Sequence, residues 1–282
     1  MQDGTPELRG EADERARNGA PAPIFAVRFP DDAPAGDRPD GGGPRLSVVA
    51  PMYNEEGGAA ALVGEIAQAL KEIPHEIIVV DDCSRDGTRA VLEKAMDDFP
   101  TLRVLTHGAN AGQSRAVRTG VLAARAPIVV TLDGDGQNDP ADIPALHAAL
   151  SRAEAPALLA MVAGERVKRV DSAAKRWASR AANAIRARAL RDGAADTGCG
   201  LKAFYREAYM RLPYFDHMHR YLPALMRREG FHIEFRKVSH RARAHGTSKY
   251  TNWGRLAVAF RDMLGVMWLN DRARRPIDIT EL

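Results

Sequence analysis

Long apolar runs and cysteines are both scarce in this sequence. Its 282 residues contain no run of about 18 uninterrupted apolar residues, the length that a membrane-spanning helix needs, and the polar, acidic N-terminus does not resemble a signal peptide. Only two cysteines are present, Cys83 and Cys199, which argues against a disulfide framework and fits a reducing compartment. The sequence therefore predicts a cytoplasmic protein without a transmembrane helix.

Several common binding motifs are missing as well. Neither G-x-G-x-x-G nor G-x-x-x-x-G-K-[ST] occurs, which counts against a dinucleotide-binding site and against a P-loop. The formal net charge of +3 is accompanied by no zinc-ligand spacing and no aromatic-spaced basic motif, so we expect no nucleic-acid partner. With 45% hydrophobic residues, the chain is long enough for one large core with appendages.

Composition divides the chain into three parts. Residues 1–44 are dominated by Gly, Pro, Ala, Asp and Arg, which bury too little apolar surface to offset the entropy lost on ordering. We therefore predict a disordered tail there and a folded domain over residues 45–251. Residues 252–282 are predicted to form an amphipathic helix followed by a basic tail.

Short, β-branched apolar runs recur about every 25–30 residues, with helical patterns between them. This alternation predicts an α/β fold: a doubly wound, mostly parallel sheet with helices on both faces. A later stretch, 231–238, alternates polar and apolar residues like an edge strand. The parallel strands are expected at 46–50, ended by Pro51, and at 76–81, 102–105, 127–132 and 157–163.

An acidic motif follows the fourth of these strands. Asp133 and Asp135 are two residues apart in an extended segment, so their carboxylates point to the same side. Gln137 adds a neutral oxygen, and hard oxygen ligands of this kind suit Mg²⁺ or Mn²⁺ held together with a substrate's phosphates. Asp139 can cap a helix that has Pro140 in its first position. The alternative is that these acids only decorate a turn.

A second pair of acids, Asp81 and Asp82, ends the second strand. Ligands of open α/β sheets bind at the carboxyl ends of the strands, where a carboxylate can accept from a base N–H or a ribose hydroxyl. The alternative is helix capping, but beside the metal motif the pair favours nucleotide binding. Arg115, near the start of a predicted helix, can reach a phosphate or lie on a solvated helix face.

Two later segments are rich in cations. Residues 240–250 combine basic residues, hydroxyls and a glycine, which suits a loop that closes over phosphates. Residues 252–270 are amphipathic and are followed by Arg272, Arg274 and Arg275. This helix can lie in a membrane interface or pack on its own sheet. Its candidate membrane contacts are Trp253, Phe260, Met267 and Trp268.

Five motifs, taken in order, resemble those of family 2 glycosyltransferases with the GT-A fold, of the dolichol-phosphate mannosyltransferase or polyprenyl-phosphate glycosyltransferase type. The resemblance covers about residues 46–268. The motifs are Pro51-Met52-Tyr53-Asn54-Glu55, Asp81-Asp82 with Ser84 and Asp86-Gly87-Thr88, Asn110 with Gly112, Asp133-Gly134-Asp135-Gly136-Gln137, and Gly246-Thr247-Ser248-Lys249-Tyr250.

The resemblance implies roles for individual residues. The nucleotide would be held by Pro51, Tyr53, Glu55, Asp81, Asp82 and Arg115. The metal and diphosphate would be held by Asp133, Asp135 and Gln137. Phosphates would be bound by Arg166, Arg180, Arg243, Ser248 and Lys249, and Asp196 would lie near the acceptor. The residues taken as closest to catalysis are Asp135, Asp196, Arg243 and Lys249.

The implied reaction is an inverting, metal-dependent transfer of mannose or another hexose. The donor would be GDP-mannose or a UDP-sugar, and the acceptor a dolichyl or undecaprenyl phosphate. Alternatives are transfer to a glycan or lipid hydroxyl, with Asp196 as the base, and a nucleotide-sugar-binding subunit without turnover. The enzyme would work at the inner face of the membrane, through its own C-terminal helix or through a membrane partner subunit.

Overall fold

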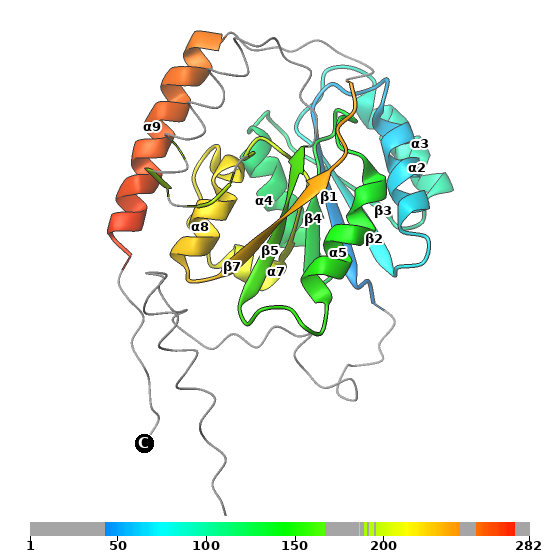
Figure 1. Cartoon of the computed structure of the whole chain (residues 1–282). Helices are drawn as coiled ribbons and strands as arrows, with labels where there is room; N and C mark the ends of the chain where they lie inside the picture. The colour runs from blue at the N-terminus through cyan, green and yellow to red at the C-terminus, as the bar shows by residue number, and fades with distance from the viewer. Residues whose placement is uncertain are drawn as a thin grey trace, which may run out of the picture.

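A seven-stranded mixed sheet with the order β3-β2-β1-β4-β6-β5-β7 runs through the described part of the chain (Figure 1). The computed structural model describes residues 43–166, 186, 189–190, 192–194, 196–242 and 252–273. The predicted tail up to residue 42 lies outside this range. The strands are β1 (Leu46–Met52), β2 (His75–Asp81), β3 (Leu102–Thr106), β4 (Ile128–Thr131), β5 (Leu159–Arg166), β6 (Lys202–Tyr205) and β7 (His232–Val238).

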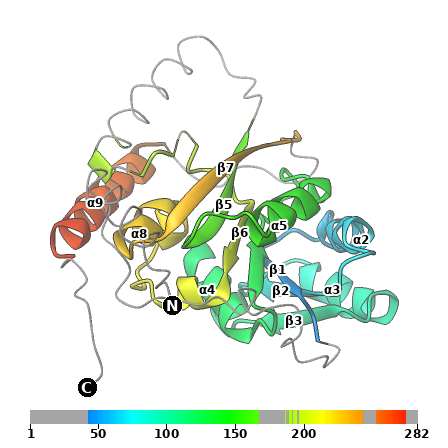
Figure 2. The same ribbon diagram turned by 60° about the horizontal axis from the view of Figure 1, so that its bottom comes forward.

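Helices cover both faces of the sheet, as predicted. Figures 1 and 2 place α2, α3 and α5 on one side and α4 and α8 on the other. The helices are α2 (Ala59–Ala69), α3 (Thr88–Asp98), α4 (Gln113–Ala123), α5 (Ile143–Ser151), α7 (Arg206–Met210), α8 (Leu222–Arg228) and α9 (Asn252–Asp271), with short 3₁₀ turns η2 (Pro140–Asp142) and η3 (Met218–Arg220).

The strands β1 to β4 form the parallel half of the sheet. β1 pairs with β2 and β4, and β2 pairs with β3, all in parallel. The prediction that Pro51 ends the first strand was wrong, because β1 continues to Met52 with Pro51 opposite Val80. The carbonyl of Pro51 lies toward Gly134, past the end of β4, and the amide nitrogen of a strand residue faces the same side as its carbonyl. The missing N–H of Pro51 therefore faces no strand residue, and the proline costs no ladder hydrogen bond.

The strand β6 was not predicted and is the antiparallel element of the sheet. It lies between β4 and β5 and is antiparallel to both, with Thr131 opposite Lys202. Because β6 runs in the opposite direction, its first residue meets the carboxyl ends of its neighbours. The loop that precedes β6 therefore enters the edge of the sheet where the acidic motif lies.

The last two long strands pair in parallel at one margin of the sheet. β5 extends to Arg166, three residues beyond the predicted end at 163, because Arg166 still pairs with Val238 of β7. β7 pairs with β5 alone within the described sheet, which confirms the predicted edge strand.

The helix α9 packs on the domain with one face and exposes the other. Val266 is fully buried, and Tyr221 donates a 2.9 Å hydrogen bond to the carbonyl of Ala259. On the outer face, Phe260, Leu264 and Trp268 are 58%, 49% and 59% exposed. Among the described residues, no helix combines the length and the apolar character that a bilayer-spanning segment requires.

Candidate active site

The candidate site lies at the carboxyl edge of the parallel strands, the upper edge in Figure 1. There β4 ends at Thr131 and the acidic loop begins, while β1 and β2 end beside it at Met52 and Asp81. The antiparallel β6 brings the residues that precede it to the same edge. Segments that are far apart in the sequence therefore meet around the acidic loop.

The acidic loop is closed by its own polar side chains. The N–H of Asp133 donates to the side-chain oxygen of Asn138 at 3.1 Å, and the N–H of Gln137 donates to a carboxylate oxygen of Asp135 at 3.1 Å. Gly134 packs so tightly on β1 that a Cβ there would lie 2.5 Å from the carbonyl oxygen of Pro51. Only glycine fits at this position.

The helical turn after the loop confirms the predicted cap. Asp139 accepts a 3.0 Å hydrogen bond from the N–H of Ala141, and Pro140 occupies the first position of η2. This short 3₁₀ turn leads directly into α5.

The carboxylate of Asp133 is half-buried and crowded. It accepts a 2.7 Å hydrogen bond from the side-chain amide of Gln113, and a Cβ added to Gly200 would lie 2.4 Å from its carboxyl carbon. Burial, and next the neighbouring Asp135 carboxylate, raise the pKa of Asp133, while Lys202 acts in the opposite direction. A raised pKa means that burial and mutual repulsion disfavour the charged form of Asp133. A bound cation would relieve that repulsion, so the two carboxylates form a site that favours a cation.

The donor set fits a hard divalent ion that shares its coordination with a ligand. Within the described residues, no group of three or more His, Cys, Asp or Glu side chains is arranged to hold a metal. Asp133 and Asp135 offer two carboxylates, which is the protein contribution typical of Mg²⁺ sites completed by phosphates and water. For Gln137, the structure gives a contact of the backbone: its N–H donates to a carboxylate oxygen of Asp135.

Arg166 and Asp196 form a paired group beside this loop. The guanidinium of Arg166 binds both carboxylate oxygens of Asp196, at 2.6 and 2.7 Å. Burial tends to raise the pKa of Asp196, but the hydrogen bonds from Arg166 outweigh it and hold that pKa below its usual value. Asp196 is therefore a weak base. Two residues that the sequence assigned separately thus act as one unit.

Lys202 is a buried cation that none of the sequence motifs indicated. Its ammonium donates to the carbonyl of Cys199, and burial lowers its pKa against the opposing pull of Cys199 and Asp133. Together with Asp133 it lines a cavity of about 20 Å³. That volume is enough for about one water molecule.

His219 also lines this small cavity and was not predicted. Its Nδ1 lies 2.7 Å from the hydroxyl oxygen of Ser114. Burial lowers the pKa of His219 well below its usual value, so the ring is neutral at pH 7. Both missed residues come from outside the recognised motifs. Lys202 could have been noticed as a lysine within an apolar stretch, whereas His219 lies in a polar segment that gives no such signal.

The two acids at the end of β2 do different things. Asp82 accepts from the backbone N–H groups of Ala111 and Gly112, at 2.9 and 2.8 Å, and from a ring nitrogen of His107 at 2.7 Å. Both of its oxygens are therefore engaged within the protein. Asp81 uses its Oδ1 for Ser84.

The first two predicted nucleotide motifs are connected by hydrogen bonds. The N–H of Asn54 donates to the Ser84 hydroxyl at 2.9 Å, and the N–H of Glu55 donates to the Thr88 hydroxyl at 2.8 Å. Asn54 and Cys83 both adopt positive φ, at 55° and 62°, which non-glycine residues rarely do. The loop after β1 and the loop after β2 therefore form one preshaped surface. The first carries Pro51, Tyr53 and Glu55, and the second follows Asp81 and Asp82.

The remaining predicted residues are less closely tied to the acidic loop. The guanidinium carbon of Arg115 lies 4.1 Å from the centroid of the Tyr214 ring, so this exposed residue stacks on an aromatic ring. Four further candidates lie outside the described residues: Arg180, Arg243, Ser248 and Lys249.

Comparison with known proteins gives a consistent set of relatives. The family model described as Glycosyl transferase family 2 matches residues 47–212. The chain is 34% identical over 237 residues to a dodecaprenyl-phosphate galacturonate synthase of Rhizobium johnstonii, covering 82% of this chain and 69% of the relative. It is 33% identical over 210 residues to an undecaprenyl-phosphate 4-deoxy-4-formamido-L-arabinose transferase of Pseudomonas fluorescens, covering 73% of this chain and 60% of the relative.

Solved structures share the fold. Glucosyl-3-phosphoglycerate synthase from Mycobacterium tuberculosis, in complex with Mn²⁺, uridine diphosphate and phosphoglyceric acid, matches with a TM-score of 0.60 at 18% identity, over 91% of this chain and 87% of that chain. A complex of the same enzyme with Mg²⁺ and uridine diphosphate matches with a TM-score of 0.59 at 18% identity, over 81% and 79% of the two chains. The predicted GT-A arrangement is thereby confirmed.

Proposed function

Because the chain belongs to glycosyl transferase family 2, we propose that it transfers a sugar from a nucleoside diphosphate to a polyprenyl phosphate, in one displacement with inversion. The observation that carries this proposal is the pair Asp133 and Asp135 at the carboxyl edge, beside the Arg166–Asp196 unit. An acidic pair next to a paired arginine offers a place for a cation and a place for a phosphate.

Asp133 and Asp135 would hold Mg²⁺ or Mn²⁺, which would offset the charge of the departing diphosphate. Gln113 fixes the orientation of the Asp133 carboxylate through its 2.7 Å hydrogen bond. Because Gly200 has no side chain, it leaves space for the carboxylate of Asp133. Gln137 is proposed as a further oxygen donor to the same ion.

The acceptor phosphate is proposed to bind Arg166. A phosphate monoester has a second pKa near 6, so it is mostly dianionic at pH 7 and can attack without a strong general base. Asp196, with its lowered pKa, orients the guanidinium of Arg166 rather than removing a proton. This pairing disfavours transfer to a hydroxyl, for which Asp196 would have to act as the base.

The donor site is proposed on the connected loops after β1 and β2. The base and the ribose would contact Pro51, Tyr53 and Glu55. Asp81 would accept a hydrogen bond from a base N–H or a ribose hydroxyl. Asp82 is proposed to hold the loop of Ala111 and Gly112 in place, since both of its oxygens are engaged there. Arg115 would have to leave the ring of Tyr214 to reach a phosphate. Arg180, Arg243, Ser248 and Lys249 stay predictions from the resemblance.

The sugar is not assigned. The names of the two relatives refer to galacturonate and to 4-deoxy-4-formamido-L-arabinose, and the solved neighbours bind uridine diphosphate. These findings favour a UDP-linked donor as the first to test, and nothing in them supports GDP-mannose. A membrane partner subunit is likewise without support.

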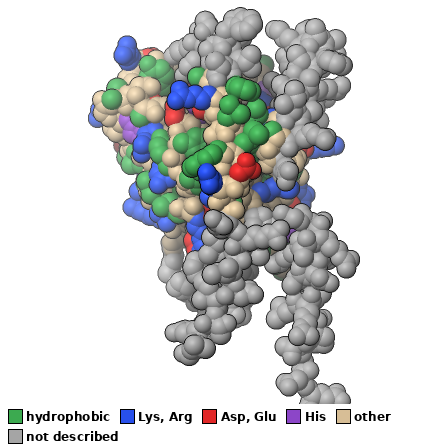
Figure 3. All heavy atoms as spheres, turned by 90° about the vertical axis from the view of Figure 1, so that its left-hand side faces the viewer, with side chains coloured by type: hydrophobic (Ala, Val, Ile, Leu, Met, Phe, Trp, Pro, Cys, Tyr) green, Lys and Arg blue, Asp and Glu red, His purple; other side chains and the backbone are tan. Residues whose placement is uncertain are grey.

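Membrane contact is proposed through the outer face of α9. Figure 3 shows the side of the molecule on which this helix lies, where apolar and basic side chains are interspersed. Phe260, Leu264 and Trp268 are exposed there, and the guanidinium carbon of Arg272 lies 5.9 Å from the ring centroid of Trp268. Met267, a predicted membrane contact, packs instead against the core, and the side chain of Trp253 lies outside the described residues.

The test is incubation of the purified chain with Mg²⁺ or Mn²⁺, undecaprenyl phosphate and a panel of UDP- and GDP-sugars. Formation of a glycolipid from one donor, lowered by about 10²–10³-fold in Asp133→Asn, is the expected result. Nucleotide-sugar binding without any glycolipid would favour the binding subunit instead. A product formed only with a glycan or lipid hydroxyl as acceptor would overturn the proposed acceptor.

A further inference from the structure

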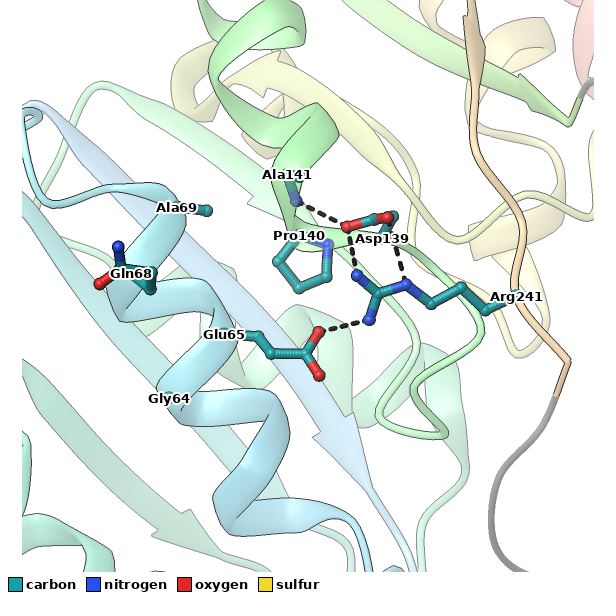
Figure 4. Close-up of a pocket in the computed structure, with 8 residues that line it drawn as sticks. All are labelled: Gly64, Glu65, Gln68, Ala69, Asp139, Pro140, Ala141 and Arg241. Carbon is teal, nitrogen blue, oxygen red and sulfur yellow. Dashed lines mark hydrogen bonds and ion pairs between the residues drawn. The ribbon is translucent and has the colours of Figure 1, made fainter.

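Arg241, three residues after β7, joins parts of the chain that are distant in sequence. Its guanidinium binds both carboxylate oxygens of Asp139, at 2.6 and 3.1 Å, and one oxygen of Glu65 at 2.5 Å. Figure 4 shows the guanidinium between these two carboxylates, one from α2 and one from the start of η2. One side chain thus connects the chain after β7, the turn after the acidic loop and a helix.

The backbone strengthens this connection. The N–H of Arg241 donates to the carbonyl of Gln137 at 2.9 Å, and His240 pairs with Asn138 in an isolated antiparallel bridge. The N–H of Ser239 donates to a carboxylate oxygen of Asp142 at 2.7 Å. Residues 239–241 therefore run beside residues 137–142, like one more short strand against the loop.

The acidic loop is consequently held at two ends. At the inner end, Asn138 accepts from the N–H of Asp133. At the outer end, Asp139 caps η2 through Ala141 and is held in turn by Arg241. The loop that these two contacts close, residues 133–139, carries both proposed metal ligands. Arg241 therefore binds the residue next to Asn138, whose side chain accepts from the N–H of Asp133.

We propose that Arg241 is a positioning residue that sets the geometry of the loop carrying Asp133 and Asp135. This inference rests on the proposed function, in which those two carboxylates share a divalent cation. The forked guanidinium matters because it engages both oxygens of Asp139 and still reaches Glu65. A lysine ammonium in its place keeps the charge but loses the two-point contact.

The surroundings of Arg241 determine how strong this connection is. The side chains of Arg241, Glu65 and Asp139 are 41%, 44% and 20% exposed. They line the rim of an open hollow of about 350 Å³ together with residues of α2 and η2 (Figure 4). An isolated exposed pair contributes little, but a two-point contact within a network of charges fixes geometry. Because of the exposure, salt weakens the connection.

The first experiment measures hydrogen exchange in the metal-free protein, comparing wild type with Arg241→Ala and Arg241→Lys. Arg89→Ala is the matched control, since Arg89 forms its ion pair with Glu93 of the same helix, on the exposed surface of α3. Amides over 134–142 should exchange several-fold faster in Arg241→Ala and at an intermediate rate in Arg241→Lys. Unchanged exchange in Arg241→Ala would overturn the proposal.

The second experiment titrates Mn²⁺ in the presence of UDP into the same proteins. Arg241→Ala should bind Mn²⁺ about 10-fold more weakly, the lower end of what loss of an outer-shell partner costs. The double variant with Asp139→Asn should be no weaker than Arg241→Ala alone, because Arg241 acts through Asp139. Equal affinity in wild type and Arg241→Ala would overturn the proposal. If the wild type bound no Mn²⁺, the proposed function would fail, and hydrogen exchange would still decide whether Arg241 holds the loop.

Discussion

Glu76 and Asp133 are carboxylates at opposite ends of the same sheet, and they have opposite electrostatic environments. Glu76, near the start of β2, is 5% exposed and accepts from the Ser47 hydroxyl, the Arg125 N–H and the Arg103 guanidinium. Burial tends to raise the pKa of Glu76, but these hydrogen bonds outweigh it and hold the pKa below its usual value. Its partners stabilise the charged form.

Asp133, after β4, has the opposite balance. Burial and the neighbouring Asp135 raise its pKa, and the hydrogen bond from Gln113 and the charge of Lys202 offset this only in part. The difference shows how to separate a structural carboxylate from a ligand-binding one. Glu76 is satisfied by partners from the protein, whereas Asp133 is crowded by another acid and left short of donors, which makes Asp133 the better candidate for a ligand-binding carboxylate.

The largest expected effect is on activity at the carboxyl edge. Asp133→Asn should lower sugar transfer by about 10²–10³-fold, the loss typical when one charge-stabilising group is removed. Because its pKa is raised in the folded protein, neutralising Asp133 should leave the melting temperature of the metal-free protein unchanged or higher. The measurements are glycolipid formation and thermal unfolding. A stable variant with wild-type turnover would remove Asp133 from the reaction.

A steric change beside Asp133 should act more mildly. Gly200→Ala would place a Cβ 2.4 Å from the carboxyl carbon of Asp133, so the carboxylate has to move. We expect Mn²⁺ affinity to fall about 10-fold or more, as for other changes that reorient a ligand. Gly108→Ala is the matched control, because a Cβ there meets nothing within 4 Å. Calorimetric titration of both variants checks this, and equal affinities would contradict the described position of Asp133.

At the amino edge of the sheet, Glu76→Gln should destabilise the fold without lowering the rate of sugar transfer by the folded protein. Loss of the charged acceptor should lower the free energy of unfolding at pH 7 by about 1–3 kcal/mol. Since the folded pKa is lowered, the ionised carboxylate of Glu76 contributes fully above its unfolded pKa of about 4.3 and loses that contribution as the pH falls through the folded value. The difference between wild type and variant should therefore shrink in acid. Urea unfolding at several pH values measures it, and a constant difference down to pH 3 would refute the assignment.

The smallest effect is expected on the exposed face of α9. Replacing Phe260, Leu264 and Trp268 by serine should reduce binding to anionic vesicles several-fold without lowering the melting temperature, because these side chains are exposed. Basic residues near an anionic surface add about 1 kcal/mol each, so salt should weaken binding too. Leu122→Ser, at another exposed apolar residue, is the control. Flotation that is equal for all three proteins would mean that α9 does not contact membrane.

Features that depend on residues close together in the sequence could be predicted, and contacts between distant residues could not. The parallel half of the sheet, the acidic loop and the cap by Asp139 come from local patterns, and the structure confirms them. The contacts of Asp133 with Gln113 and Gly200 join residues far apart in the sequence. The contact with Gly200 also depends on β6 running antiparallel, and the four residues of β6 are too few to show a period. Arg166 and Asp196 were both selected, but their pairing depends on the same arrangement.

Asp133 as a cation ligand and Glu76 as a structural group are distinguished most directly by Mn²⁺ binding. The measurement is electron paramagnetic resonance of Mn²⁺ with UDP, titrated with wild type, Asp133→Asn and Glu76→Gln at pH 7, where the folded fraction of each is first established. We expect Glu76→Gln to bind Mn²⁺ as tightly as the wild type and Asp133→Asn to bind none at the same concentrations. Wild-type binding by Asp133→Asn, or a loss of binding in folded Glu76→Gln, would contradict the account.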